Sequence, residues 1–205
     1  SGTSDVLEYL LHNKYHEKGI DINLHDIWGE TPLHLAAAKT STLVALLLQH
    51  GAGPDVVQGE GQVPLHYVYL NKGPDRLEAV ELLSNHIGCP INARDEIGRT
   101  PIVHLLDSVH CVELLLDRGA DISICDNNGR SIMHHACIED RPEIIAMLLK
   151  KCPERAQELA MHSDAEGDTP LFTSLRYYRA QCAELLLTRA PISKVKDRHG
   201  WSLLH

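Results

Sequence analysis

The sequence has no run of apolar residues near the roughly 20 that a membrane-spanning helix requires, and its N-terminus lacks the basic and then apolar order of a secretory signal. We therefore expect no direct insertion into a membrane. Paired cysteines are also missing, because the six cysteines stand singly and form no CxxC motif. Scattered thiols are typical of a reducing compartment. We expect an intracellular protein, cytoplasmic or alternatively nuclear.

Positive charge is scarce. Lysine and arginine number 19 against 28 aspartates and glutamates, which leaves a formal net charge of −9. Affinity for nucleic acid or anionic lipid grows from clustered lysine and arginine that neutralise phosphates. This balance argues against nucleic acid as a partner and favours partners with basic groups.

Catalytic motifs are absent too. The chain has no HExxH, no glycine loop that would cradle a phosphate and no GxSxG elbow. Its 14 histidines suggest a metal site, but the adjacent His134 and His135 make a poor pair of ligands because neighbouring residues on a helix do not face each other. We expect no enzyme activity, no cofactor and no metal in this segment.

The chain does contain a repeated string. It begins as "DIWGETPLH" at Asp26 and returns in altered form five times, with glycines that are 32, 37, 31, 38 and 33 residues apart. These six glycines are Gly29, Gly61, Gly98, Gly129, Gly167 and Gly200. A fixed period of this length indicates a repeat architecture.

Each residue of the string has a physical purpose. The Asp26 side chain can turn its own backbone, and Gly29 tolerates a positive φ, so "DIWG" predicts a tight hairpin-like bend. Thr31 then caps a helix whose first residue is Pro32, where no N–H is needed. Further along, Gly51 closes "LLLQHG" and predicts the end of a second helix.

Between the copies lies a second recurring string, a short leucine-rich helix such as "CVELLLDRGADIS". Its apolar residues Val112, Leu115 and Leu116 recur at helical spacing, so one face packs and the other meets water. The unit is turn, helix, turn, helix, and the fold class is all-α.

These strings resemble the ankyrin repeat, whose consensus runs through G-x-T-P-L-H-x-A-A, a leucine-rich helix and G-A-D-x-N. The resemblance covers essentially the whole chain and implies a solenoid of helix-turn-helix units in a single array. We expect partial repeats at 1–25 and 197–205, so the natural protein would continue on each side. The expected full repeats are 26–57, 58–94, 95–125, 126–163 and 164–196.

Three copies depart from the pattern. In the second, Tyr67, Val68 and Tyr69 occupy the region that holds alanines in "LHLAAA", so we expect a wider or differently tilted junction. The third copy is short between its helices. The fourth carries extra residues, "KKCPERAQELAMHS", which predict a longer second helix or a further short helical piece.

The resemblance also assigns a purpose to the recurring histidines. His34, His66, His134 and His205 share one repeat position, where the imidazole is implied to brace the hairpin and the helix start. We interpret them as structural rather than catalytic.

In similar arrays the hairpin tips and the starts of the inner helices line a concave groove, which is where we expect a protein or peptide partner. Trp28 and Ile97 are large and apolar where the fold asks only for a turn residue, and exposed anchors of this kind are typical of binding hot spots. The alternative is that Trp28 packs on its neighbouring hairpin. The candidate contacts at the tips are Trp28, Glu30, Glu60, Ile97, Arg99, Asn128 and Arg130.

A second candidate surface is "RYYR" at the end of the fifth inner helix, formed by Arg176, Tyr177, Tyr178 and Arg179. Arginine and tyrosine are enriched in interface cores, and this cluster suits a carboxylate-bearing or phosphorylated peptide. The alternative is that a tyrosine fills the helix junction while the arginines are simply solvated.

Asn23 in "DINLHD" and Asn92 in "PINARD" stand where similar ankyrin proteins are hydroxylated on asparagine, which would make the chain a substrate. The alternative is a turn asparagine that bonds to its own backbone.

The predicted function is therefore an interaction module, as a scaffold, adaptor or targeting segment whose isolated form we expect to be monomeric. The competing hypothesis is a substrate-recruiting or regulatory arm of a larger enzyme, such as a ubiquitin ligase, a methyltransferase or a kinase.

Overall fold

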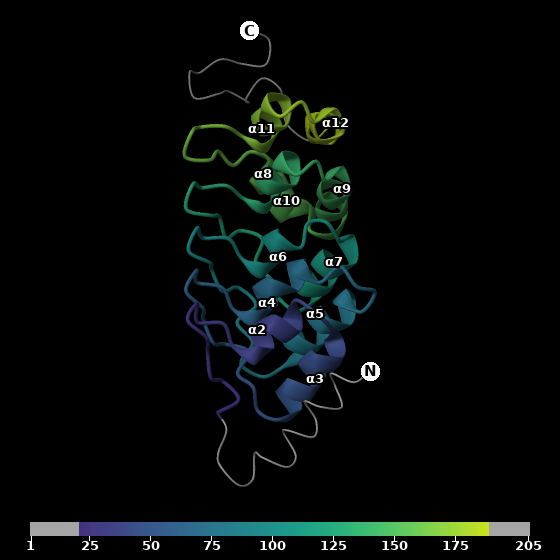
Figure 1. Ribbon diagram of the computed structural model, residues 1–205. Coiled ribbons are helices and arrows are strands. Elements are labelled where there is room, and N and C mark those ends of the chain that lie inside the picture. Colours follow the sequence, from purple (N-terminus) through teal and green to yellow (C-terminus); the bar gives the residue numbers. More distant parts are fainter. Residues whose placement is uncertain (1–20, 189–205) are drawn as a thin grey trace. The chain divides into compact units, whose positions relative to one another are not determined.

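The computed structural model describes residues 21–188. His205, the partial repeat expected at 197–205 and most of that expected at 1–25 lie outside the described residues. Within 21–188 all regular secondary structure is helical and no strand occurs, which confirms the all-α prediction (Figure 1).

The chain divides into two compact units. The first unit comprises Ser1–Glu96 and Leu114–Gly119, and the second comprises Ile97–Glu113 and Ala120–His205. Among the described residues, the first unit has the helices α2 (Pro32–Ala37), α3 (Ser41–Gln49), α4 (Pro64–Tyr67), a 3₁₀ turn η1 (Val68–Leu70) and α5 (Arg76–Asn85). Helix α7 (Val109–Asp117) contributes its second half to this unit.

Up to residue 188, the second unit holds the first half of α7 and six further helices. They are α6 (Pro101–His104), α8 (Ile132–Ile138), α9 (Pro142–Lys151), α10 (Pro153–Ala160), α11 (Pro170–Arg176) and α12 (Ala180–Leu187).

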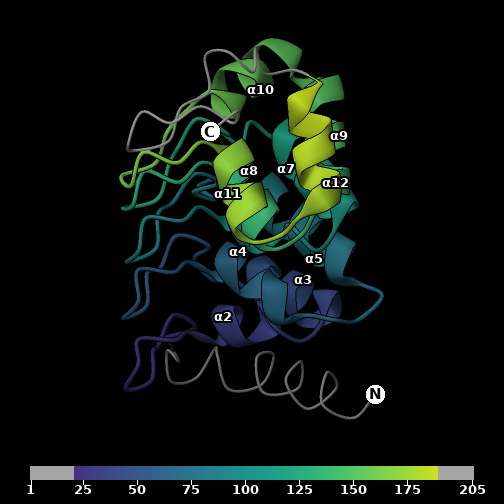
Figure 2. The same ribbon diagram turned by 90° about the horizontal axis from the view of Figure 1, so that it is seen from above.

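Each unit has an inner and an outer layer of helices, with the hairpins on the inner side (Figure 2). In the first unit α2 packs against α3 and α4, and α3 packs against α5. In the second unit α8 packs against α9 and α11, and α12 packs against α9 and α11. One helix pair cannot bury its apolar face alone, so each pair is stabilised by its neighbour.

The core lies between these layers. Fully burying a large aliphatic side chain contributes about 1.5–3 kcal/mol. The largest fully buried side chains of the first unit include Leu33, Leu65 and Leu83. Those of the second unit include Ile132, Met133, Ile144, Ile145 and Leu148.

The helix boundaries follow the predicted signals. Thr31 is the N-cap of α2 and has an extended backbone, and Pro32 is the first helical residue. Gly51 has a φ of 85° just after α3, and the Ala52 N–H donates to the Leu47 carbonyl at 3.0 Å. Both predictions are confirmed.

The irregular copies differ in their helices. Where Val68 and Tyr69 replace the alanines of the pattern, the inner helix α4 has only four residues and continues as a 3₁₀ turn. The third copy has the equally short α6. In the fourth, Pro153 begins the separate helix α10 directly after α9, which confirms the expected short helical piece.

Candidate partner-binding surface

An aspartate side chain turns the hairpins at Asp26, Asp126 and Asp164, and Gln58 takes this place in the second copy. Oδ1 of Asp26 accepts hydrogen bonds from the N–H groups of Trp28 and Glu30, both at 2.9 Å, and Gly29 has a φ of 84°. Oδ1 of Asp126 accepts from Asn128 and Arg130 in the same way, at 2.9 and 2.8 Å. The predicted purposes of Asp26 and Gly29 are confirmed.

Successive hairpins are joined by backbone hydrogen bonds at their tips. In the first unit the Gly59 N–H donates to the Trp28 carbonyl at 2.9 Å, and the Glu96 N–H donates to the Glu60 carbonyl at 2.8 Å. In the second unit the same bonds join Asn127 to Ile97 at 2.9 Å and Ala165 to Asn128 at 2.8 Å. The backbone of the tips is therefore held in place by these hydrogen bonds.

The repeated histidine braces both its own helix and the next hairpin. Nδ1 of His34 accepts the Thr31 N–H at 3.1 Å and lies 2.9 Å from the Thr31 hydroxyl. Nε2 lies 3.2 Å from the Gln62 carbonyl, to which it donates. Burial lowers the pKa of His34, so the neutral ring that this geometry requires is favoured. The structural interpretation of His34 is confirmed.

His134 repeats this arrangement in the second unit. Its Nδ1 accepts the Ser131 N–H at 3.2 Å, and its Nε2 donates to the Asp168 carbonyl at 2.9 Å. In the fifth copy Phe172 stands at the histidine position, and the buried Thr169 hydroxyl has no hydrogen-bond partner among residues 21–188. The contact to the next repeat was not foreseen, although the recurrence of histidine was its signal.

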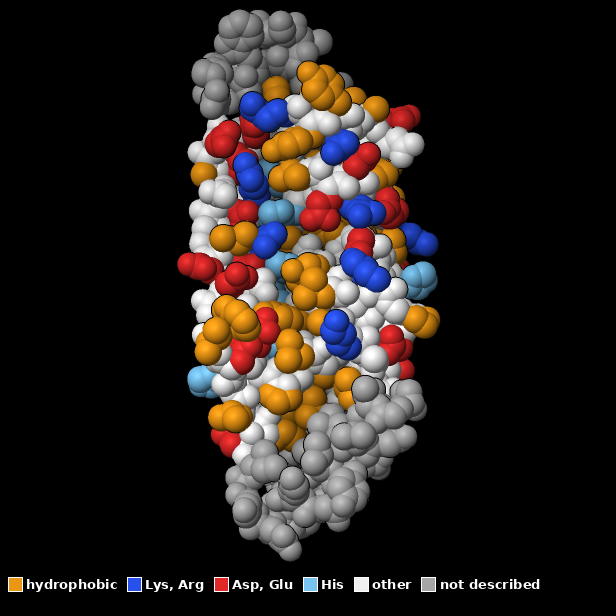
Figure 3. Space-filling view, in the orientation of Figure 1, with side chains coloured by type: hydrophobic (Ala, Val, Ile, Leu, Met, Phe, Trp, Pro, Cys, Tyr) orange, Lys and Arg blue, Asp and Glu red, His pale blue; other side chains and the backbone are white. Residues whose placement is uncertain are grey.

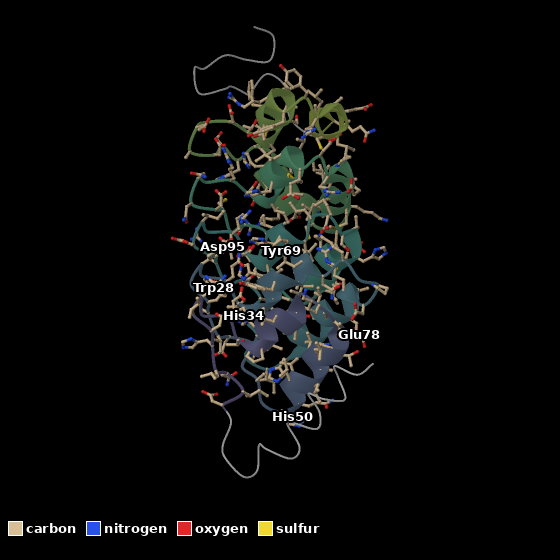
Figure 4. The ribbon with its side chains drawn as sticks, viewed as in Figure 1. Trp28, His34, His50, Tyr69, Glu78 and Asp95 are labelled. Atoms are coloured by element: carbon tan, nitrogen blue, oxygen red, sulfur yellow. The ribbon has the colours of Figure 1, made fainter. Side chains whose placement is uncertain are left out.

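The first unit carries a cleft at its hairpin tips, of about 550 Å³. The tip cleft is lined by Ile27, Trp28, Glu30, Gln58, Gly59, Glu60 and Tyr67. Trp28 is 67% exposed, so the alternative in which its side chain packs away on a neighbouring hairpin does not describe this structure. Figure 4 shows Trp28 on the hairpin side and His34 nearer the helices.

A hydrogen-bonded chain runs across the floor of the tip cleft. The Tyr67 hydroxyl donates to the Glu30 carboxylate, the Gln58 amide donates to the Tyr67 oxygen at 3.1 Å, and the Glu60 N–H donates to the Gln58 side-chain oxygen. Burial is the main cause that raises the pKa of the Tyr67 hydroxyl above its usual range, and the hydrogen bond to Glu30 adds to it. The hydroxyl therefore stays protonated and acts as a donor. Sequence reasoning noticed Tyr67 only as a departure from the alanine pattern.

The hairpin tips of the second unit have a different character. Ile97 is 51% exposed. The Arg130 guanidinium lies 3.5 Å from Asp164 and 3.9 Å from Glu166, and Arg99 is near enough to His135 to oppose its protonation. Acidic and basic side chains alternate along this edge, whereas acidic and apolar ones gather on the tips of the first unit (Figure 3).

The "RYYR" cluster spans the turn from α11 to α12. Tyr177 is 41% exposed, whereas Tyr178 is 92% exposed with a φ of 58°, so Tyr178 does not fill a helix junction. Nη2 of Arg176 lies 2.6 Å from the Asp168 carboxylate. Arg179 donates to the Ile138 carbonyl at 3.3 Å and lies 3.7 Å from Asp140. Both arginines are thus engaged within the chain.

The two asparagines differ in accessibility. Oδ1 of the half-buried Asn23 accepts the Gly53 N–H at 2.8 Å. Asn92 is exposed, and its amide lies 3.3 Å from the Gly119 carbonyl. Both side chains therefore bond to the backbone of the following turn, about 30 residues away.

The described residues offer little else of chemical interest. No cluster of three metal-ligating side chains occurs within 21–188. In the same range no helix has the length and apolar content needed to cross a membrane. The cysteines, including the buried Cys111, Cys137 and Cys182, are free thiols.

Comparisons with known proteins agree with this architecture. The family model "Ankyrin repeats (3 copies)" matches residues 1–95 and 74–158. The SH3 and multiple ankyrin repeat domains protein 2 of Homo sapiens is 28% identical over 187 residues, which cover 88% of this chain and 10% of that protein. The B-cell lymphoma 3 protein homolog of Mus musculus is 31% identical over 134 residues, which cover 63% of this chain and 30% of that protein.

Among solved structures, the crystal structure of the ankyrin repeat domain of Bcl-3 matches with a TM-score of 0.80 and 25% identity. The match covers 98% of this chain and 87% of that one. The chain spans less than a third of the length of either relative named above. With its helix pairs, aspartate-turned hairpins and histidine braces, the chain belongs to the ankyrin repeat family.

Proposed function

We propose that this chain is a protein-interaction module that binds a protein or peptide partner through its hairpin tips and the first turns of its inner helices. The observation that carries this proposal is a rigid tip backbone with exposed apolar side chains, Trp28 in the first unit and Ile97 in the second. Because the backbone that carries these large apolar side chains is already fixed, little backbone freedom is lost on binding. Large apolar side chains at such positions are typical of hot spots.

The repeat organisation supports this proposal. We propose 26–57, 58–94, 95–125, 126–163 and 164–196 as the repeats, each with one hairpin and at least two helices. Stacked units of this kind present a row of tips that one partner can contact at several points. Glu30, Glu60, Arg99, Asn128 and Arg130 are the polar contacts of that row.

The module acts by complementarity and needs no catalytic group or cofactor of its own. The net charge of −9 disfavours nucleic acid as the partner, and we place the protein in the cytoplasm or nucleus. The relatives are much longer than this chain. The same surface would also serve a larger enzyme, such as a ubiquitin ligase, methyltransferase or kinase, as a substrate-recruiting arm.

The turn between α11 and α12 is a second contact surface in this proposal. Because Arg176 and Arg179 are held by Asp168 and Asp140, the exposed Tyr177 and Tyr178 are the side chains that remain for a partner. The left-handed backbone at Tyr178 directs its ring outward at some cost in strain.

Asparagine hydroxylation remains a proposal for Asn23 and Asn92. We expect Asn92 to be modified more readily because it is exposed. Mass spectrometry of the protein isolated from cells would show an added oxygen on the peptide that contains Asn92.

Affinity capture with matched variants tests the interaction surface. The intact array is compared with Trp28→Ala, with Ile97→Ala and with the control Ile87→Ala, whose side chain is 93% exposed but lies outside the hairpin tips. Urea unfolding first confirms that each variant is folded. We expect partners retained by the wild type and by Ile87→Ala to be lost with Trp28→Ala or Ile97→Ala. Retention of every partner by both tip variants would contradict the proposal.

A further inference from the structure

We infer that the tip cleft of the first unit binds a cationic side chain, lysine or arginine, from an extended segment of the partner protein. This inference rests on the proposed function and names the chemistry that the cleft selects. It follows from the shape of the cleft, from its charge and from the contrast with the second unit.

The cleft combines an aromatic surface with two carboxylates. Trp28 forms one side, while Glu30 and Glu60 come from two successive hairpins. A cation on the face of a tryptophan is attracted by the ring electrons, and a carboxylate at the same place adds a charge-assisted hydrogen bond. A neutral side chain gains the contact with the ring and a weaker hydrogen bond that no charge assists.

The two carboxylates have no cationic partner within the described part of the chain. Neither Glu30 nor Glu60 forms an ion pair with a lysine or arginine among residues 21–188. Asp26 adds a further negative charge to the same hairpin. An unneutralised acidic cleft favours a basic group from outside.

The Glu30 carboxylate is also held in one position. The Tyr67 hydroxyl donates to it, and the buried Gln58 holds that hydroxyl from the other side. A group that is already ordered loses little freedom when a ligand arrives. The bond to Tyr67 uses part of the hydrogen-bonding capacity of the carboxylate, which can accept about four bonds in all.

In the second unit an arginine lies beside the acidic groups of the next hairpin tip. Arg130 occupies the fourth place after Asp126, and its guanidinium lies beside the acidic groups of the next hairpin, Asp164 and Glu166. The fourth place after Asp26 holds Glu30 instead. The second unit therefore supplies its own cation at the tip, whereas the first unit leaves that position to a partner.

Nuclear magnetic resonance tests the inference with small probes. The indole N–H signal of Trp28 is identified by its loss in Trp28→Phe. This signal is followed during titration with the Nα-acetyl methylamides of arginine, of lysine and of the neutral citrulline, so that the arginine and lysine side chains keep their charge. We expect the charged probes to shift this signal with a Kd about tenfold lower than that of the citrulline probe, and the difference to shrink in high salt.

Charge-neutral variants locate the effect. Glu30→Gln keeps an acceptor for Tyr67 and removes only the charge, and Glu60→Gln is its counterpart on the other hairpin. We expect each to raise the Kd of the charged probes by about threefold to tenfold. The matched control Glu166→Gln alters an acidic tip residue of the second unit and is expected to leave the Kd unchanged.

Equal shifts with citrulline and arginine probes, no shift with either charged probe, or equal effects of Glu30→Gln and Glu166→Gln would overturn the inference. Partner capture that is lost with Trp28→Ala but insensitive to Glu30→Gln and Glu60→Gln would overturn the inference while leaving the proposed function intact. Capture that is insensitive to Trp28→Ala and Ile97→Ala would instead overturn the proposed function.

Discussion

The tips of the two units share one backbone geometry but differ in charge. In both units an aspartate turns the hairpin, and a tip carbonyl accepts a hydrogen bond from the following hairpin. The first unit then presents Trp28 beside Glu30 and Glu60, while the second pairs Arg130 with Asp164 and Glu166. The scaffold therefore sets where tip residues stand, and the residues that vary between copies decide what they can bind.

The largest effect that we expect concerns the shared backbone geometry. A Cβ added at Gly61 would lie 2.8 Å from the Glu96 nitrogen, at a φ of 76°. We expect Gly61→Ala to lower the free energy of unfolding by about 3 kcal/mol. At Gly129 of the second unit the nearest atom is 3.2 Å away, so the loss should be smaller. Urea unfolding measures both.

Gly51 supplies the control for this prediction. Its φ is 85°, yet a Cβ there would meet nothing within 4 Å. We expect Gly51→Ala to cost about 1 kcal/mol, from the backbone conformation alone. Equal losses at Gly51 and Gly61 would mean that the close approach of successive hairpins contributes nothing.

Acid should weaken the second unit more than the first. Burial lowers the pKa of His134, and it lowers that of His135 from 6.5 to about 4 even though Asp126 lies 3.0 Å away. In the first unit burial lowers the pKa of His34 in the same way. Because these pKa values are lower in the folded state, the unfolded state binds more protons and stability falls as the pH drops below 6.5.

Because His135 takes up its proton more readily in the unfolded state, this residue alone should lower the free energy of unfolding by about 3 kcal/mol between pH 7.5 and pH 4. Urea unfolding from pH 7.5 down to pH 4 measures this loss, and His135→Gln should flatten the curve because glutamine does not titrate. An equally steep curve in His135→Gln would assign the acid sensitivity to other groups.

The threonines at the helix starts provide a sharper contrast. The Thr31 hydroxyl lies 2.9 Å from His34, whereas Phe172 replaces the histidine beside Thr169, and the buried Thr169 hydroxyl has no partner in the described part of the chain. We expect Thr31→Val to cost about 1 kcal/mol and Thr169→Val to be neutral or slightly stabilising. Thermal unfolding compares the two variants. A larger loss at Thr169 would show that its hydroxyl has a partner after all.

The smallest expected effect concerns the charge at the tips. Arg130→Gln would remove the cation beside Asp164 and Glu166 and give the second unit an acidic tip like that of the first. Partly exposed ion pairs contribute little, so we expect a loss of about 0.5 kcal/mol that shrinks in high salt. Urea unfolding at low and high salt measures it. A loss that persists in high salt would show that Arg130 acts through packing instead.

Much of the fold could be predicted because its signals are local. The Asp26 turn, the positive φ of Gly29, the cap at Thr31 and the helix end at Gly51 each depend on residues a few positions apart. The extra residues "KKCPERAQELAMHS" of the fourth copy predicted helix α10 in the same way, because a simple turn would not need them.

The candidate site was predicted only in part. Trp28, Glu30 and Glu60 were recognised as tip residues from their place in the repeat. The bond between Tyr67 and Glu30 joins residues 37 apart, and neither residue type indicates the other as its partner. The bonds of Arg176 to Asp168 and of Arg179 to Asp140 were not foreseen either, because an arginine in a sequence does not reveal which carboxylate it faces.

The sequence by itself determined the repeat, its hairpins and its helix ends, since backbone dihedral preferences and capping act over three or four residues. Only the tertiary structure decided which charges are neutralised and which stay open. The stacking of each hairpin on the next brings Arg130 to Asp164 across 34 residues, while it leaves Glu30 beside Trp28 without a cationic partner from the described residues. Such pairings depend on distances in space, which the order of residues along the chain does not contain.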